Sequence, residues 1–588
     1  MDVRPNAQAK TIQELFATKA FAVPEYQRSY AWEKQNWEDL WTDLVEGIAS
    51  GTEHYWGTIT LKATGARVRS EDDDEHFTLH EVVDGQQRLT TISLFLLALA
   101  RCGRPMLHAR YLRSGGVLRL TPGQRNIETL ERLLAGGALP PDVEVLRSNR
   151  RLQSAVDYFS DQIRAHGDPS TLATFLLTRT FVLEFVVADE ALAIRAFESL
   201  NDRGRPLSVL EKTKSALMFN SQRYLAGDHR ADINDVFGAL YSAYDVVKDR
   251  GTARGIAYLS SGKFDENVVL QWFYHCVGAW AVRKHGLPSG YDYNYTAESI
   301  FNAFIKDSCA GLKAEPARLR AFLADLLDQL SSFTSAMQRL VDRVATDLRL
   351  RKMLVFLGVD AILYPVLVGL ETRNLLDDAM LDAIERLDIR VYKVLGKRNR
   401  AGIYEIFPHV IGGASGADLR AMVNGNCAYH SPPSSFLAAL GELRFSVQNP
   451  FVAYLLWAFE KAADDTFDDG DADLYRIVQL DHIWPQSLTV QLPTDGFSDE
   501  ADYASAIDRL GNLCLLEGRD NARAQNKSPS VKARDVYQGL TTLPRSRALG
   551  FQIGQHGWRK ADIEATTARM IEFAMSRWAP SPPTTKSA

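Results

Sequence analysis

The sequence has few cysteines, and they do not form a Cys-x-x-Cys pair. The five cysteines among 588 residues stand far apart, at positions 102, 276, 309, 427 and 514. This spacing argues against a disulfide framework and against a zinc knuckle, and it is typical of a reducing compartment. The first residues also lack the long apolar segment of a signal peptide. We therefore expect a cytoplasmic protein.

A strong net charge and a clear membrane segment are lacking as well. The formal net charge of −6 excludes nucleic-acid binding through bulk charge, so any such surface must be local. One apolar run, from Met353 to Leu370, is about as long as a membrane span. Asp360 in its middle, Pro365 and the charged flanks favour a buried helix instead. We expect no membrane contact.

The length of the chain calls for several domains. Apolar residues recur at helical spacing almost throughout residues 207–400. We predict a mostly helical, multidomain α+β protein. Its parts are an amino-terminal α+β domain over 1–225, a helical connecting domain over 226–425, a third domain over 426–578 and a disordered tail over 579–588.

The amino-terminal region starts with an apparent amphipathic helix over 11–21, TIQELFATKAF. A second helix is predicted after Trp32, where Trp37, Leu40 and Trp41 recur at helical spacing. This period favours packing in a core over a base-stacking platform. The next segment, HYWGTITL at 54–61, alternates as a strand does.

A second informative stretch lies at 79–101. LHEVV predicts a strand, Asp84 and Gly85 predict a turn, and a helix is expected from Gln86 onward. A strand, a glycine turn and a helix N-terminus can bind phosphate through free N–H groups. Arg88 would add a cation one turn into the helix, and Asp84 could orient a water or hold Mg²⁺. The same pattern also occurs as a plain connection, and both interpretations stay open.

The stretch from 480 to 527 carries the strongest chemical signal. Asp481 and His482 are adjacent, so in a strand one can bind a metal while the other faces an attacking water. Asn512 and Asn521 follow, and carboxylate and amide oxygens suit Mg²⁺ or Mn²⁺. The set is the minimum for metal-assisted phosphodiester hydrolysis. The alternative is that Asp481 caps a helix and His482 is a satisfied core histidine.

The motifs DHIWPQS and GNL and the later Asn resemble those of HNH (ββα-metal) nucleases, especially the HNH domains of GmrSD-type restriction enzymes. The resemblance implies that Asp481 and Asn521 bind one divalent cation, Mg²⁺ or Mn²⁺. It also implies that His482 is the general base and that Asn512 braces its loop. Asn526 competes with Asn521 as the second ligand. The segment between His482 and Asn512 is longer than in compact HNH domains and predicts an inserted helix.

The motifs PEYQRSYAW, WGTITL, VDGQQRLTTI and AFESLNDRGRPLS resemble, in the same order, the amino-terminal domain of GmrSD-type proteins. That domain has a ParB/sulfiredoxin-like fold. The resemblance implies a site that binds and hydrolyses GTP or another nucleoside triphosphate and regulates the nuclease. Residues 201–204 also fit a helix C-cap and turn. The implied nucleotide-binding residues are Tyr26, Gln27, Arg28, Asp84, Gly85, Gln86, Gln87, Arg88, Asn201, Asp202 and Arg203.

A local basic run follows Asn521. Arg523, Lys527 and Lys532 have few acidic residues between them, and we predict that they contact DNA phosphates. The arginine-rich segment over 101–151 fits DNA contact or solvated helices equally well.

The sequence therefore predicts a nucleotide-regulated, metal-dependent HNH endonuclease that cleaves double-stranded, modified phage DNA in restriction. The alternative is a modified-DNA-sensing NTPase or binding module without cleavage of its own. The DNA modification, the preferred nucleotide and the direction of regulation stay open. The oligomeric state stays open too, a homo-oligomer included.

Overall fold

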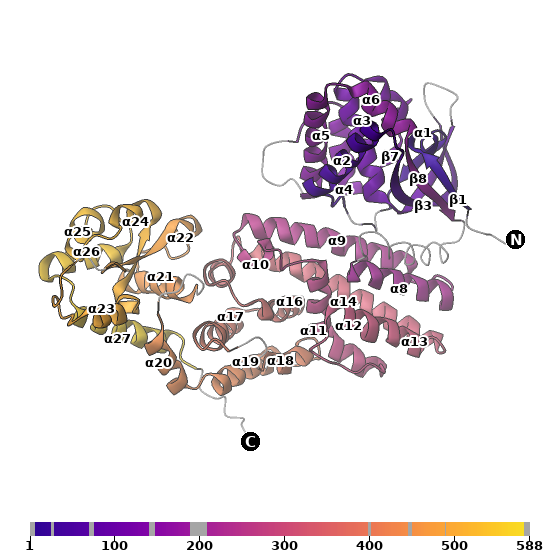
Figure 1. Cartoon of the computed structure of the whole chain (residues 1–588). Coiled ribbons are helices and arrows are strands. Elements are labelled where there is room, and N and C mark those ends of the chain that lie inside the picture. The colour runs from indigo at the N-terminus through magenta and orange to yellow at the C-terminus, as the bar shows by residue number, and fades with distance from the viewer. Residues whose placement is uncertain are drawn as a thin grey trace. The chain divides into compact units, whose positions relative to one another are not determined.

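The computed structural model describes residues 6–24, 27, 29–69, 76–139, 147–187, 208–397, 402–444, 450–487 and 490–580. The chain divides into two compact units, which we describe separately (Figure 1). The amino-terminal unit comprises Met1–Asp249, Asp265–Gln271 and Ala281–Ser335. The carboxy-terminal unit comprises Arg250–Phe264, Trp272–Trp280 and Ala336–Ala588. The protein is mostly helical α+β, as predicted, while the predicted domain boundaries remain predictions.

A six-stranded mixed sheet lies in the amino-terminal unit, with the strand order β1-β8-β3-β4-β2-β7. Strand β3 pairs antiparallel with β4 and parallel with β8, and β2 pairs parallel with β4 and β7. The segments HYWGTITL and LHEVV lie in β3 and β4, which confirms both predicted strands. The strands are β1 (Asn6–Thr11), β2 (Lys19–Ala22), β3 (His54–Arg69), β4 (His76–Asp84), β7 (Leu120–Thr121) and β8 (Thr180–Val187).

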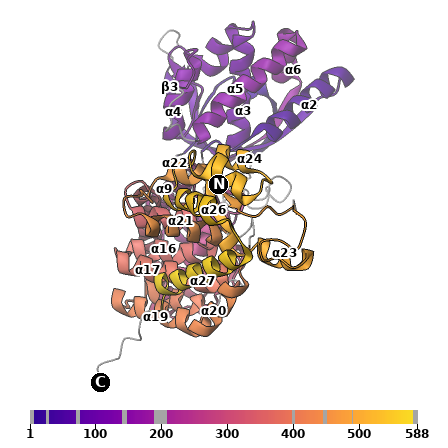
Figure 2. The same cartoon turned by 90° about the vertical axis from the view of Figure 1, so that its left-hand side faces the viewer.

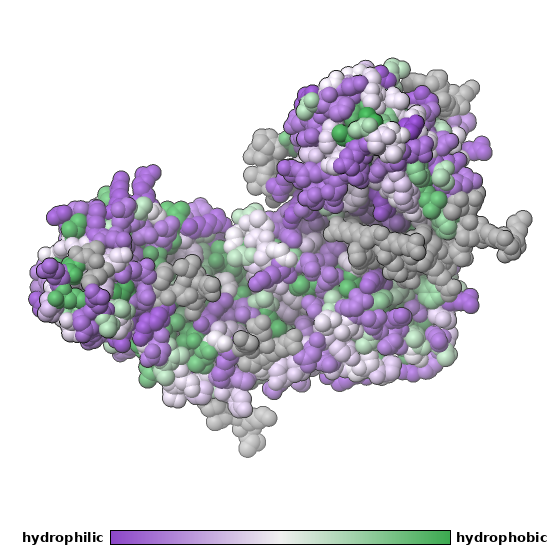
Figure 3. Space-filling model, in the orientation of Figure 1, coloured by the Kyte–Doolittle hydropathy of each residue, from purple (hydrophilic) through white to green (hydrophobic). Residues whose placement is uncertain are grey.

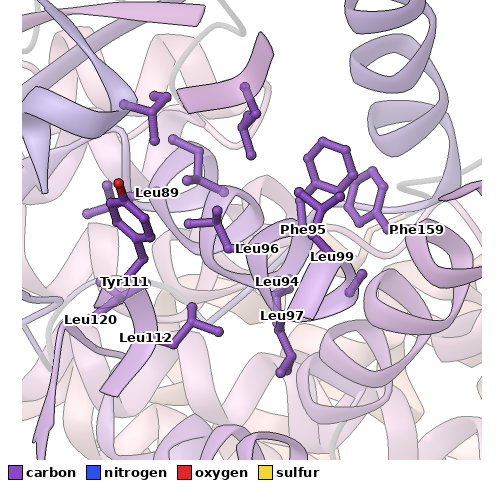
Figure 4. Close-up of a cluster of buried hydrophobic side chains, with 14 of the residues drawn as sticks. Leu89, Leu94, Phe95, Leu96, Leu97, Leu99, Tyr111, Leu112, Leu120 and Phe159 are labelled. Carbon is purple, nitrogen blue, oxygen red and sulfur yellow. The ribbon is translucent and has the colours of Figure 1, made fainter. Parts of the chain in front are cut away.

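Helix α3 (Gln86–Arg101) is buried along almost its whole length. Its apolar side chains point in all directions, as in a helix surrounded by protein. It packs against α5 (Arg147–His166), where the ring centroids of Phe95 and Phe159 lie 4.8 Å apart (Figures 2 and 4). Each fully buried Leu or Phe stabilises a fold by about 1.5–3 kcal/mol. Helix α3 therefore holds the start of the predicted phosphate turn in a fixed position.

The aromatic stripe after Trp32 lies in the core, as predicted. Helix α2 (Lys34–Ser50) buries Trp37 and Leu40 against the rest of the amino-terminal cluster. The Trp37 indole N–H donates to the Tyr30 hydroxyl at 2.9 Å, and that hydroxyl lies 2.8 Å from Thr91 Oγ1. These polar groups are satisfied inside the protein, so this stripe is no base-stacking platform.

The predicted opening helix over 11–21 is wrong in its extent. Only Ile12–Leu15 is helical (α1), with Thr11 accepting a hydrogen bond from the Glu14 N–H at its start. The chain then returns as β2, where Phe21 is fully buried and its N–H donates to the Arg119 carbonyl at 2.9 Å. Backbone pairing on both edges of β2 outweighs the helical period of this segment.

Helices form the middle of the chain, as predicted. The series begins with a capping box, in which Ser208 Oγ accepts from the Glu211 N–H and the Glu211 carboxylate accepts from the Ser208 N–H. The α-helices of five or more residues in the described part of this region are α8 (Val209–Tyr224), α9 (Arg230–Ala253), α11 (Glu266–His285), α13 (Ser308–Leu312), α14 (Pro316–Arg343), α16 (Tyr364–Thr372), α17 (Asp378–Leu387), α18 (Ile403–Val410), α19 (Gly416–His430), α20 (Pro433–Glu442) and α21 (Phe451–Ala463).

The apolar run from Met353 to Leu370 is largely buried, as predicted, but it is not one helix. A π-helical turn over Lys352–Leu357 ends at Gly358, whose φ of +62° favours glycine. The chain then passes through a short 3-10 turn into α16. None of the described helices combines the length and the apolar character that a membrane span requires. Hydrophilic residues cover most of the face shown in Figure 3.

Two antiparallel strands and a helix lie near the carboxy terminus. Strand β9 (Val478–His482) pairs with β10 (Leu513–Glu517), and α24 (Gly518–Ala524) follows directly. Helix α23 (Glu500–Ile507) lies between the two strands in sequence and confirms the predicted inserted helix. Figures 1 and 2 both show α24 close to α26. The neighbouring helices are α25 (Pro529–Lys532), α26 (Pro544–His556) and α27 (Lys560–Arg577).

Candidate active site

Strand β10 is buried on both of its faces, and this determines where the Asp-His pair points. Leu513 and Leu515 pack in one apolar cluster, while Cys514 and Leu516 pack in another. The strand register pairs Asp481 with Cys514 and His482 with Leu513. Residues directly opposite each other in a sheet share a face. The two neighbouring side chains therefore leave β9 on opposite faces, as predicted.

The Asp481 carboxylate lies inside the protein, with the residue only 5% exposed. Lys532 Nζ donates to both of its oxygens, at 2.9 Å to Oδ1 and 3.1 Å to Oδ2. The Tyr537 hydroxyl also donates to Oδ2. Burial raises the pKa of the Asp481 carboxyl, and the charge of Lys532 opposes this rise. Asp481 is thus a buried carboxylate with a built-in counter-charge, rather than a helix cap.

Lys532 was predicted to contact DNA phosphates, but the structure places it inside the protein. Its side chain is 1% exposed, and its ammonium group also donates to the His482 carbonyl at 2.5 Å. An uncompensated buried carboxylate is costly, so Asp481 requires a cation at this position. Sequence reasoning missed Tyr537. The chain from Lys532 forms a π-helical turn over Ala533–Tyr537, and i→i+5 bonding of this kind lets residues five apart meet one partner.

His482 is paired with a carboxylate that the sequence did not suggest. Its Nε2 lies 2.8 Å from Asp508 Oδ1, and Gln486 Nε2 donates to the same oxygen at 3.2 Å. Burial lowers the pKa of the imidazole, and the hydrogen bond to Asp508 opposes this shift. An ionised carboxylate only accepts hydrogen bonds, so Nε2 carries the hydrogen and Nδ1 carries the lone pair of the neutral ring.

Asn512 is fully buried and ties the segment after His482 to the end of the inserted helix. Its side-chain Oδ1 accepts from the Trp484 N–H at 2.9 Å, and its Nδ2 donates to the Trp484 carbonyl at 2.9 Å. The same Nδ2 donates to the Ile507 carbonyl at 2.8 Å, and the Asn512 carbonyl accepts from the Ile483 N–H. One side chain therefore binds both backbone groups of Trp484. The implied bracing role requires this geometry.

Asn521 lies on α24, and its Nδ2 donates to Gln479 Oε1 at 2.9 Å. Gln479 stands two residues before Asp481 on β9, so both side chains leave the strand on the same face. This contact brings Asn521 to the face that holds the Asp481 carboxylate. The competing Asn526 is exposed and lies beyond the end of α24.

The other two predicted DNA contacts lie at the surface. Arg523 is exposed on α24, with a 3.4 Å ion pair to Asp520. Lys527 is partly exposed, and its Nζ lies 3.7 Å from a carboxylate oxygen of Asp535. Ion pairs of this kind at the surface contribute little and exchange readily for other partners.

In the amino-terminal unit, the structure confirms the predicted strand, turn and helix at Asp84, Gly85 and Gln86. Asp84 ends β4, and Gly85 precedes α3 with a φ of +88°. A Cβ atom at Gly85 would lie 3.0 Å from the Thr58 carbonyl oxygen, so only glycine permits this approach of two backbones. The start of α3 is thus held against β3.

The neighbouring predicted residues bind backbone groups around this turn, on β4, on β3 and just before α2. Gln27 Nε2 donates to the Val82 and Val83 carbonyls, at 2.5 and 2.9 Å. Gln87 Oε1 accepts from the Ala31 N–H at 2.8 Å. Arg88 donates to the Thr58 carbonyl at 3.0 Å. The predicted residues Tyr26, Arg28, Asn201, Asp202 and Arg203 lie outside the described residues.

Two family models match the sequence, one over each end. The GmrSD restriction endonuclease N-terminal domain matches residues 12–218, and the GmrSD restriction endonuclease C-terminal domain matches residues 433–573. Together they span more than half of the chain. The chain belongs to the GmrSD family of restriction endonucleases. No curated protein matches the sequence.

Membership of the GmrSD family makes this chain a DNA endonuclease of restriction. The carboxy-terminal match contains β9, β10 and α24 with Asp481, His482 and Asn512. The amino-terminal match contains the whole Asp84–Arg88 turn and most of the mixed sheet.

The donor set of this GmrSD chain fits a divalent metal with few protein ligands. Three of the roughly four acceptor positions of Asp481 are used by Lys532 and Tyr537, which leaves one on Oδ1. The amide oxygen of Asn521 is of the hard type that Mg²⁺ prefers. Within the described ranges, no group of three His, Cys, Asp or Glu side chains could hold a metal ion. Water and phosphate oxygens would have to complete the coordination.

Proposed function

We propose that this GmrSD chain is an HNH-type, metal-dependent endonuclease that cleaves modified foreign DNA under the control of a bound nucleotide. The observation that carries the proposal is His482 at the end of β9. It stands next to a buried Asp481 and is hydrogen-bonded through Nε2 to Asp508. A strand, a strand and a helix position these groups, which is the order of elements that an HNH nuclease has.

His482 would act as the general base. Asp508 keeps the hydrogen on Nε2, so Nδ1 can take a proton from the attacking water. Because burial lowers the pKa of His482 from 6.5, the ring is neutral and ready to accept this proton at neutral pH. Asn512 holds the segment that follows the base through its bonds to Trp484.

Asp481 and Asn521 would hold the metal. A divalent cation such as Mg²⁺ or Mn²⁺, when bound, supplies positive charge that stabilises the negative charge developing on the phosphate. Lys532 neutralises the inner side of Asp481 and leaves one acceptor position of Oδ1 for the cation. Arg523 and Lys527 would bind the DNA backbone beside this position.

The nucleotide would bind at the turn between β4 and α3. The N-terminus of α3 offers backbone N–H groups and a positive dipole end to a phosphate. Gly85 lets another backbone approach closely, and Gln27, Gln87 and Arg88 hold the surrounding backbone through their own hydrogen bonds. GTP is the first nucleotide to test.

Cleavage of modified phage DNA and of matched unmodified plasmid, with Mg²⁺ and with or without GTP, tests the proposal. His482→Ala should abolish cleavage, whereas His556→Ala, an exposed histidine on α26, should leave it intact. Asp84→Asn should change the response to GTP without removing the nuclease. Full cleavage by His482→Ala would refute the assignment of the base. Cleavage indifferent to nucleotide would refute the regulation.

A further inference from the structure

A cavity of about 350 Å³ lies in the amino-terminal unit beside the start of α3. One wall comes from α3 and from the segment before α2, through Val23, Gln27, Ser29 and Tyr30. The others come from α5, from α4 (Gln124–Leu134) with the turn before it, and from helix α9. Most of its polar lining consists of amides and hydroxyls. These amide and hydroxyl side chains include Gln27, Gln86, Thr90, Asn126, Asn234 and Ser242.

The cavity is almost uncharged. Among the described residues that line it, none is a lysine or an arginine, and Asp235 is the one carboxylate. A neighbouring cavity of about 490 Å³ differs, because Arg147, Arg151 and Lys248 line it together with acidic residues. The uncharged cavity therefore does not suit a polyphosphate. It suits a neutral group that forms hydrogen bonds.

Two buried polar atoms in its wall, on Ser242 and Asn234, have no hydrogen-bond partner among the described residues. Ser242 is 5% exposed, and its Oγ has no hydrogen-bond partner within the described part of the protein. Two other buried helix serines bind their own helix: Ser93 Oγ donates to the Leu89 carbonyl, and Ser160 Oγ donates to the Val156 carbonyl. Asn234 Oδ1 is also buried and likewise lacks a partner among described residues. Buried polar atoms normally find partners, so this wall is suited to a ligand.

The rest of the lining is apolar. Val23, Pro122 and Leu152 contribute apolar surface, and Tyr30 contributes an aromatic ring. A volume of about 350 Å³ is near the lower end of ligand pockets, which span about 300–1,000 Å³. Apolar walls with hydrogen-bonding groups at the edge match a flat heterocycle joined to a small hydroxylated ring.

We infer that this cavity binds the uncharged nucleoside part of the nucleotide, the base with its sugar. The inference rests on the proposed nucleotide regulation and names the place of the base. Gln86 joins the two sites, because it is the first residue of α3 and also lines the cavity. Phosphates at the helix N-terminus would then leave the base pointing toward Ser242 and Asn234. The same chemistry could come from a base extruded from DNA, which the test distinguishes.

Isothermal titration of the full chain tests the inference with three probes. These are GTP, guanosine without phosphate, and a short DNA duplex that carries one mispaired base, which is easier to extrude. Ala239→Trp fills the cavity, and Ser242→Ala removes one hydroxyl. Ser308→Ala is the matched control, because Ser308 Oγ is also buried without a partner in the described residues but does not line the cavity.

We expect Ala239→Trp to abolish guanosine binding and Ser242→Ala to weaken GTP and guanosine about five- to tenfold, the loss of one neutral hydrogen bond. Ser308→Ala should bind like wild type. If the Ala239→Trp and Ser242→Ala variants lost binding of the mispaired duplex alone, the occupant would be a DNA base, and a free nucleotide as occupant would be refuted. Wild-type binding by Ala239→Trp, or no binding of any probe to wild type, would overturn the inference.

Cleavage measured on the same preparations separates the two proposals. Nucleotide binding that depends on Ala239 and Ser242, with cleavage indifferent to nucleotide, would leave the cavity in place and refute the regulation. If the Ala239→Trp variant cleaved DNA with the same response to nucleotide as the wild type, the assignment of the cavity to the nucleoside would be refuted and the regulation would stand.

Discussion

Replacing Lys532 with methionine should destabilise the carboxy-terminal unit and abolish cleavage. The ammonium group donates to both oxygens of Asp481 and to the His482 carbonyl, so all three of its hydrogens are used. Methionine is also long and unbranched and can fill much of the same space. It leaves the buried carboxylate with Tyr537 as its hydrogen-bond donor and without a counter-charge. Removing one partner of a buried ion pair costs about 3–5 kcal/mol.

Thermal unfolding followed by circular dichroism or calorimetry measures this cost. A loss of about 1 kcal/mol lowers Tm by about 2–4 °C in a unit of this size, so we expect a fall of roughly 10 °C. The double variant Lys532→Met with Asp481→Asn removes both charges and should recover much of the stability. It should not recover cleavage, because position 481 would no longer offer a charged oxygen to the proposed metal.

The surface residue Lys527 provides the matched control. Lys527→Met should leave Tm almost unchanged and weaken DNA binding, with a smaller dependence of affinity on salt. A Lys532→Met protein that unfolds at the same Tm as the wild type and differs only in DNA affinity would refute the stabilising role of the buried Lys532–Asp481 pair. That result would restore the prediction made from the sequence.

Three further outcomes follow from the carboxy-terminal unit. Burial raises the pKa of Asp388 from 3.8 to about 7, so stability falls as pH rises between these values. Asp388→Asn should therefore raise Tm at about pH 8, by an amount worth up to about 4 kcal/mol, and by less than half of that near pH 5; equal effects at both would contradict this. Asn512→Ala should lower stability by about 2 kcal/mol by freeing both backbone groups of Trp484, read from urea unfolding beside Asn521→Ala. Asp508→Asn should lower kcat at least tenfold with little change in KM if it sets the tautomer of His482.

Local patterns in the sequence predicted the structure correctly where the conformation of an element depends mainly on its own residues. The spacing of Trp37 and Leu40 identified the buried face of α2, and Asp84 with Gly85 identified the turn before α3. In each case the same residues carry both the signal and the structure. The predicted opening helix was too long because its final residues, around Phe21, pair with strand residues 59 or more positions away in sequence.

The partners of the candidate site could not be predicted for the same reason. Asp508 and Tyr537 lie 26 and 56 residues from their partners, on elements whose packing no spacing rule gives. The role of Asn512 could be predicted because this residue belongs to the GNL motif. Asp508 lacks such a motif, and one acidic residue in a charged segment reads as a solvated surface group.

The burial of both faces of β10 explains why Lys532 was misjudged. A strand with apolar clusters on both sides lies against the end of β9, and the residues there that pair with Cys514 and Leu513, Asp481 and His482, are both buried. A carboxylate in that position needs a cation from inside, which Lys532 provides. From the sequence alone, the same lysine reads as one more charge in a basic run. Of the three lysine and arginine residues predicted to bind DNA phosphates, Arg523 and Lys527 lie at the surface and Lys532 does not, so DNA affinity should depend on fewer of these cations than the sequence suggests.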